Sequence, residues 1–127
     1  MLARMHKLLG ILFLLAFGIG SAFARDPLEQ RKIDYLIDSV AQLRDVTFVR
    51  NGSGYDARQA ADHMRLKLRN AGERVKTAED FITCCATGSS VSGQPYTLKF
   101  SDGRVIPSAE FLRGRLAEFP EKAASQP

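Results

Sequence analysis

The sequence contains little cysteine, since Cys84 and Cys85 are the only two in its 127 residues. It has no CxxC pair and no cysteine–histidine spacing typical of a metal site, so we expect no metal and no other cofactor. Neighbouring cysteines can bridge only through a strained ring that a helix does not hold. We interpret one or both of them as small buried apolar residues, with a bridge to a second chain or a reactive thiol as alternatives.

The sequence also lacks the signals of two functional classes. No GxSxG motif is present, although this motif is the main local signature of many serine hydrolases. The formal net charge is only +4 at pH 7, and Arg4 and Lys7 belong to the N-terminal segment described next. The rest of the chain is nearly balanced and has no aromatic residues interleaved with bases. We therefore expect no binding to nucleic acid.

A long apolar run occurs only near the N-terminus. Leu8–Phe17 follows a basic start and precedes Ala22-Phe23-Ala24. This order is typical of a signal peptide, and the apolar core is shorter than the roughly 20 residues that span a membrane. We expect export, with residues 1–24 removed by cleavage after Ala24. Since no cysteine lies at the cleavage point, we expect neither a lipid anchor nor another stable membrane anchor.

The part of the chain that follows is long enough for one small domain. We assign residues 25–120 to a single globular domain and residues 121–127 to a polar flexible tail. Apolar residues recur at helical spacing in four segments. The predicted helices are about Pro27–Arg44 after the cap Asp26, a second from near Asp56 to before Gly72, a third from the cap Thr77 to before Gly88, and a fourth from Pro107-Ser108 to Pro120.

Strand signals are fewer than helix signals. Thr47–Arg50 is β-branched and aromatic, and the turn cluster Asn51–Gly54 follows it. Tyr96–Phe100 and Arg104–Ile106 flank a short connection that contains Asp-Gly, which is typical of a β-hairpin. We predict a mainly α, α+β fold in which four helices pack with a small antiparallel β-hairpin. Thr47–Arg50 is a candidate third strand.

Four blocks of the chain occur in an order and at intervals that match a known family. They are Phe48-Val49-Arg50-Asn51-Gly52, His63–Leu68, Thr77–Ile82, and Ser89-Ser90 with Ser92–Tyr96. The chain thereby resembles the YfeK-like family of small exported bacterial proteins, which is classed as a domain of unknown function. The resemblance implies a periplasmic location and supplies neither a reaction nor a site residue. It departs at Cys84-Cys85, where the family leads us to expect ordinary small or apolar residues.

The polar residues best suited to binding lie in the turn at Arg50-Asn51 and in the loop Gly88–Tyr96. If Thr47–Arg50 pairs beside Tyr96–Phe100, these loops meet at one end of the sheet, and their hydroxyl, amide and guanidinium groups converge. The alternative is that the amide and the serines satisfy their own turns while the arginine makes a structural salt bridge. The candidate ligand-binding residues are Arg50, Asn51, Ser89, Ser90, Ser92 and Tyr96.

The stretch from residue 58 to residue 76 is basic. Such a face suits anionic envelope polymers or lipid headgroups, and a solvated helix surface explains it as well. Its bases are Arg58, Arg65, Lys67, Arg69, Arg74 and Lys76, against the acids Asp62 and Glu73.

We favour a small soluble periplasmic binding or interaction protein, whose partner is an envelope protein, a glycan or an anionic polymer. The first alternative is a small cell-envelope hydrolase that uses Ser89 or Ser90 with His63, the one histidine after the signal. The second is an inhibitor of a lysozyme-like envelope enzyme. Its basis is Ser92-Gly93-x-x-Tyr96, which is similar to the loop that some periplasmic inhibitors insert into the enzyme.

Overall fold

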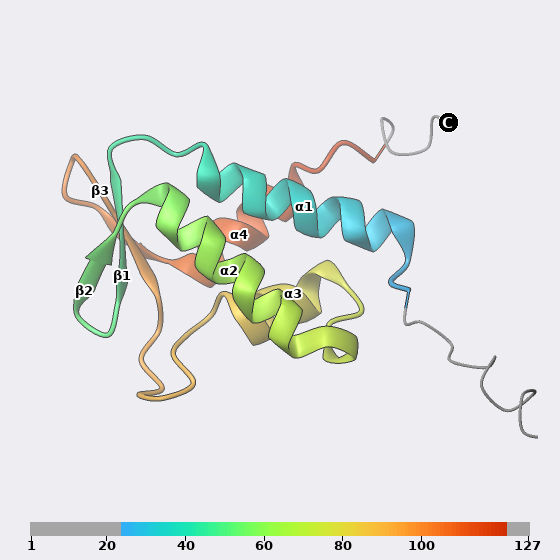
Figure 1. The fold of residues 1–127 in the computed structure, drawn as a ribbon. Helices are drawn as coiled ribbons and strands as arrows, with labels where there is room; N and C mark the ends of the chain where they lie inside the picture. Colours follow the sequence, from blue (N-terminus) through green and yellow to red (C-terminus); the bar gives the residue numbers. More distant parts are fainter. Residues whose placement is uncertain (1–23, 122–127) are drawn as a thin grey trace, which may run out of the picture.

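The computed structural model describes residues 24–121, so the expected signal peptide up to residue 23 and the tail from residue 122 lie outside the described residues. Four α-helices and a four-stranded antiparallel sheet form an α+β fold in this part of the chain. The sheet lies at one end and the helices extend from it (Figure 1). None of the helices in residues 24–121 has the length and apolar character to cross a membrane.

Helices α1 (Pro27–Ala41) and α2 (Ala57–Ala71) lie side by side across the molecule (Figure 1). The first helix begins as predicted, because the carboxylate of Asp26 accepts a hydrogen bond of 2.8 Å from the backbone N–H of Leu28. It ends before the predicted Arg44. The chain there turns toward the sheet through Asp45, which has a φ of 56°.

The second helix begins and ends where the sequence predicts. Asp56 and Gln59 form a reciprocal capping box, and Gly72 follows the last turn with a φ of 53°. Its buried stripe consists largely of alanine, together with Met64. Because alanine projects little, the backbone of α2 lies close to its neighbours.

The sheet has four strands rather than the predicted hairpin or three strands. They are β1 (Val46–Arg50), β2 (Ser53–Tyr55), β3 (Thr97–Phe100) and β4 (Val105–Pro107), in the order β2-β1-β3-β4. The predicted hairpin is the β3–β4 pair, and the candidate third strand is β1, which pairs with β3. The additional strand is β2, which lies in the segment that reads as a turn.

The turn between β1 and β2 is shorter than its composition indicates. Only Asn51 and Gly52 adopt positive φ, at 50° and 76°, which is the pattern of a two-residue hairpin turn. Ser53 therefore already pairs with Arg50. Gly54 is in the strand, where an added Cβ would lie only 2.9 Å from Cγ2 of Thr47.

Two shorter helices complete the core. Helix α3 (Ala78–Cys85) follows the 3-10 turn η1 (Gly72–Arg74) and has the predicted capping box between Thr77 and Asp80. Helix α4 (Ser108–Ala117) begins directly after β4. The core lies between the helices and one face of the sheet, and its fully buried large side chains include Ile33, Leu36, Phe81, Ile82, Leu98 and Leu112.

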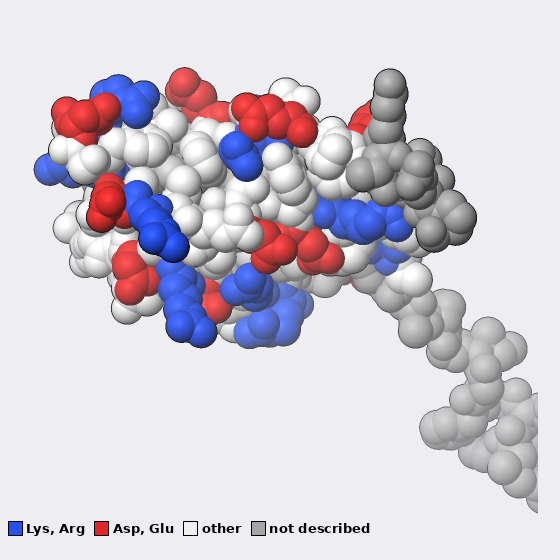
Figure 2. Space-filling model, turned by 90° about the horizontal axis from the view of Figure 1, so that it is seen from above, with Lys and Arg blue, Asp and Glu red and all other residues white. Residues whose placement is uncertain are grey.

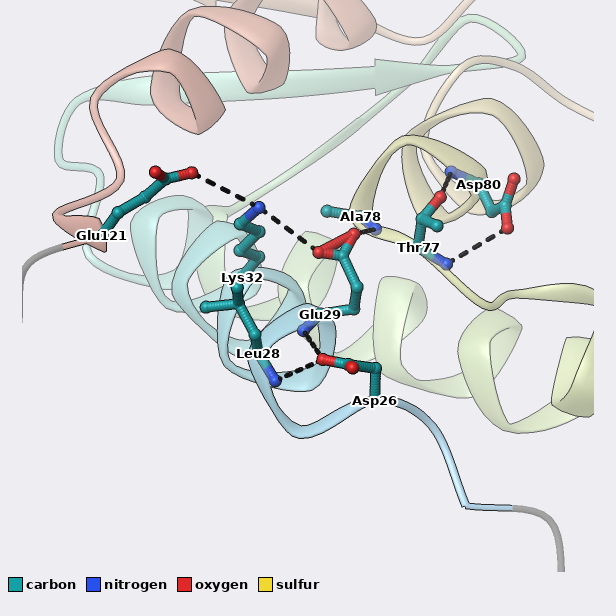
Figure 3. A network of polar contacts seen from close by, with 8 residues as sticks. All are labelled: Asp26, Leu28, Glu29, Lys32, Thr77, Ala78, Asp80 and Glu121. Carbon is teal, nitrogen blue, oxygen red and sulfur yellow. Dashed lines mark hydrogen bonds and ion pairs between the residues drawn. The ribbon is translucent and has the colours of Figure 1, made fainter. Parts of the chain in front are cut away.

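A network of polar contacts joins the starts of α1 and α3 (Figure 3). The carboxylate of Glu29 accepts a hydrogen bond of 3.1 Å from the backbone N–H of Ala78 and pairs with Lys32 at 3.3 Å. Lys32 also lies 3.7 Å from Glu121. These contacts hold the two helix starts together at the end of the molecule away from the sheet (Figure 1).

Candidate functional site

A pocket of about 430 Å³ lies between α2 and the strands β1 and β2. This volume is within the usual range for small-molecule sites. Its walls are mainly apolar and include Phe48, Tyr55, Ala60 and Met64. The inner face of β1 forms one wall of the pocket. Residues of α2 form the opposite wall, and its small side chains leave space between the two.

Three buried polar atoms give the pocket its chemistry. They are Nε of Arg50, Nε2 of His63 and Oγ of Ser108, and none of them has a hydrogen-bond partner among the described residues. All three residues line this pocket. A buried polar group without a partner costs about 1 to 3 kcal/mol, so native proteins contain few of them. Three residues that each carry such an atom therefore line this one pocket.

The position of Arg50 follows from strand geometry. It lies two residues after the buried Phe48 in β1, and alternate residues of a strand face the same side. Its side chain is therefore directed toward the helices, where it lines the pocket. Arg50 forms no ion pair with any residue from 24 to 121, so the alternative of a structural salt bridge is not found in the described chain.

His63 lies on α2 and is partly buried. Burial lowers the pKa of His63 below its ordinary value of 6.5, and the nearby charges of Arg50 and then Lys67 lower it further. The imidazole is therefore neutral near pH 7. A neutral imidazole offers one donor and one acceptor, and here the buried nitrogen is unpaired.

Tyr96 is held as a fixed wall of the pocket. Its hydroxyl accepts a hydrogen bond of 2.9 Å from Nζ of Lys67, which also donates to the carbonyl of Gly88 at 3.3 Å. The backbone carbonyl of Tyr96 accepts a bond of 2.8 Å from the N–H of Ser108. The ring of His63 meets that of Tyr96 edge-on at 6.4 Å between centroids.

Among the three residues with an unpaired buried atom, Ser108 is the one that the sequence does not mark as a candidate site residue. It is the first residue of α4 and only 1% exposed. The helix begins without a side-chain cap, so the hydroxyl of Ser108 is not used for capping. The sequence marks this residue only as part of a helix start. Its place in the pocket depends on tertiary contacts that no local pattern reveals.

The structure brings the two predicted loops together and divides their residues into two groups. Arg50 and Tyr96 line the pocket, whereas Asn51, Ser89 and Ser92 bond to one another. The amide Nδ2 of Asn51 donates to Oγ of Ser89 at 3.2 Å, and the hydroxyl of Ser92 donates to Oδ1 of Asn51. The second group thus joins the β1–β2 turn to the loop before β3.

The residues proposed for a hydrolase do not form a dyad in this structure. Ser89 and Ser90 are not among the residues that line the pocket, and no hydrogen bond joins either to His63 in residues 24–121. Oγ of Ser89 instead accepts from Asn51 and from backbone N–H groups of its own loop. Ser108 shares the pocket with His63, but their buried atoms do not bond to each other.

The loop considered for lysozyme inhibition has its two named residues engaged within the domain. The hydroxyl of Ser92 bonds to Asn51, and Tyr96 is only 7% exposed. Val91 of the same loop is an exposed large apolar residue, at 87%.

The basic residues after position 58 do not act as a single free face. Arg65 pairs with Asp62 at 3.0 Å and with Asp38 at 3.6 Å, and Lys67 is bonded to Tyr96. Arg74 donates to backbone carbonyls at the end of α2. On the face seen in Figure 2, bases and acids are intermixed. Several bases of this stretch are therefore already engaged in ion pairs or hydrogen bonds within the domain.

The two cysteines have different environments and are both free thiols. Cys85 is buried, and burial followed by a hydrogen bond with Cys84 raises its pKa to about 12. Cys84 is exposed. Within residues 24–121, no cluster of three His, Cys, Asp or Glu residues is arranged to hold a metal ion.

The comparisons with known proteins agree with the resemblance found in the sequence. Residues 27–120 match the family described as "Family of unknown function (DUF5329)". The uncharacterized protein YfeK of Salmonella typhimurium strain LT2 is 44% identical over 68 residues, which cover 54% of this chain and 57% of that protein. The chain thus spans little more than half the length of this relative. No solved structure matches it.

Proposed function

The chain belongs to the DUF5329 family, whose function is unknown, and from this premise we propose that it is a small exported protein that binds a ligand in the pocket between α2 and the sheet. The observation that carries the proposal is that three residues with an unpaired buried polar atom, Arg50, His63 and Ser108, line that one pocket. The predicted signal peptide supports a periplasmic location.

Binding is better supported than turnover. A serine hydrolase needs a hydroxyl within reach of its base and donors for the developing oxyanion. The buried atoms of Ser108 and His63 make no hydrogen bond to each other, and Ser108 is almost wholly buried. The pocket is also better suited to binding than the outer loop surface. Asn51, Ser89 and Ser92 are used to hold that loop in place.

Nuclear magnetic resonance with a small-molecule library tests this function on the processed protein. We expect compounds that bind to shift backbone amide signals of β1 and α2. The variant Ala60→Phe should abolish these shifts, because Ala60 lines the pocket and is 9% exposed. Arg58→Phe places the same ring at an exposed position of the same helix and should leave the shifts unchanged.

Two results would contradict the proposed function. One is a set of shifts that survives Ala60→Phe in a folded protein, and the other is a set that maps to a different surface. If Ala60→Phe does not fold, Leu66→Trp provides the second variant. Leu66 is 45% exposed at the rim of the pocket, so the larger side chain of tryptophan is tolerated there and narrows the entrance.

A further inference from the structure

We infer that the ligand of this pocket is a small organic carboxylate on an apolar body, with its carboxylate bound by Arg50 and Ser108. The inference rests on the proposed function and names the chemical class that the same pocket takes. It follows from the hydrogen-bonding capacity of the unpaired atoms, the charge around them and the walls of the pocket.

Of the three unpaired atoms, Nε of Arg50 is the one that requires an acceptor. The Nε–H of Arg50 can only donate, and it belongs to a group that stays positively charged. The hydroxyl of Ser108 and the buried nitrogen of His63 can each contribute one more bond. A carboxylate has two oxygens that accept several bonds, and its bonds to guanidinium are stronger than those between neutral groups.

The charge around the pocket excludes a cation and favours an anion. Asp62 is the one acid among the residues that line it, and its carboxylate is already bonded to Arg65 at 3.0 Å. Arg69 is an exposed base at the rim, and Lys67 is close enough to His63 to lower its pKa. The bases thus outweigh the unpaired acids, and a ligand amine would meet repulsion.

The walls determine the rest of the ligand. Phe48, Ala60 and Met64 are at most 9% exposed and offer apolar contact to a ligand body. A phosphate dianion would bring a second charge against these apolar walls. Of the two guanidinium groups that line the pocket, only that of Arg50 is partly buried, since Arg69 is exposed at the rim. A carboxylate brings one charge, and an alkyl or aryl body gains free energy by leaving water.

Calorimetric titration of the processed protein compares three ligands of equal chain length: octanoate, octanol and octylamine. We expect octanoate to bind about tenfold or more tightly than octanol, because only the carboxylate pairs with the guanidinium. We expect no binding of octylamine. Inorganic phosphate alone serves as the test for a site that takes any anion, and it should not bind.

Variants identify the residue that selects the carboxylate. Arg50→Met keeps an unbranched apolar stem and removes the guanidinium charge, so octanoate should bind about tenfold more weakly while octanol is unaffected. Arg58→Met, on the exposed side of α2, should change neither affinity. Ser108→Ala is the second variant if Arg50→Met does not fold, and it should weaken octanoate binding in the same direction.

A peptide with a C-terminal leucine, compared with the same peptide amidated, distinguishes two sources of the carboxylate. Binding of the free-acid peptide alone assigns the site to peptide C-termini, and binding of octanoate alone assigns it to free acids. Either result supports the inference. Equal affinity for octanoate and octanol, an Arg50→Met variant with unchanged octanoate affinity, or binding of phosphate without octanoate would overturn it.

These outcomes separate the inference from the function on which it rests. If octanol binds as well as octanoate and Ala60→Phe abolishes both, the pocket is a binding site and only the carboxylate assignment fails. If Ala60→Phe changes the affinity of no ligand, the proposed function itself fails.

Discussion

At the scale of single residues, the proposed binding role of the pocket implies a cost in the stability of the unliganded protein. Ser108 is 1% exposed and its hydroxyl has no partner in the described chain, whereas Ser89 is 5% exposed and its hydroxyl oxygen accepts three hydrogen bonds. The same side chain therefore has opposite effects on the free energy of unfolding at these two positions.

The variant Ser108→Ala should raise the free energy of unfolding of the unliganded protein by about 1 kcal/mol, because it removes a buried polar group without a partner. Ser89→Ala is the matched control and should lower the free energy of unfolding by about 1 kcal/mol, because three donors lose their acceptor. Urea denaturation measures both. Equal destabilisation by the two substitutions would show that the Ser108 hydroxyl is satisfied in the folded protein.

His63 should make stability depend on pH. Its pKa in the folded protein is lowered from 6.5, so the unfolded chain binds the proton first as the pH falls. Stability should therefore decrease as the pH falls below about 6.5, until His63 of the folded protein is also protonated. The variant His63→Gln should lose less stability over the same pH range. Parallel curves for parent and variant would contradict the assigned cause.

At the scale of elements, the parts predicted correctly depend on neighbours in the sequence. The capping boxes at Asp56 and Thr77 each involve residues within one helical turn. The missed strand β2 depends on how much of Asn51–Gly54 the turn consumes, which is decided by pairing with β1. In the same way, the sequence marks Arg50 and Tyr96 as candidate site residues because they belong to loops that are expected to meet. Ser108 has no such signal, although it lines the same pocket.

The start of α3 is a direct test of this local control. The hydroxyl of Thr77 accepts a hydrogen bond of 3.0 Å from the backbone N–H of Asp80. Thr77→Ala should lower the free energy of unfolding by about 1 kcal/mol. Thr77→Ser should retain most of the parent protein's stability, because serine caps in the same way. Thermal or urea unfolding measures the difference. Equal stability of the two variants would show that the cap contributes little to the fold.

At the scale of the whole molecule, the pocket is assembled from segments far apart in the sequence. Arg50 is at the end of β1, His63 is on α2, Tyr96 precedes β3 and Ser108 begins α4. The sequence predicts most of these elements, but it does not predict which side chains are left without partners, since that depends on the packed structure. This arrangement is the basis for proposing a binding protein rather than an enzyme.

An experimental structure of the processed protein with octanoate bound tests this account most directly. We predict that the alkyl chain lies against Phe48 and Met64. We also predict that the carboxylate oxygens lie within hydrogen-bond distance of Nε of Arg50 and Oγ of Ser108. An octanoate molecule bound elsewhere, or a pocket in which Arg50 and Ser108 bond to other protein groups instead, would contradict the account.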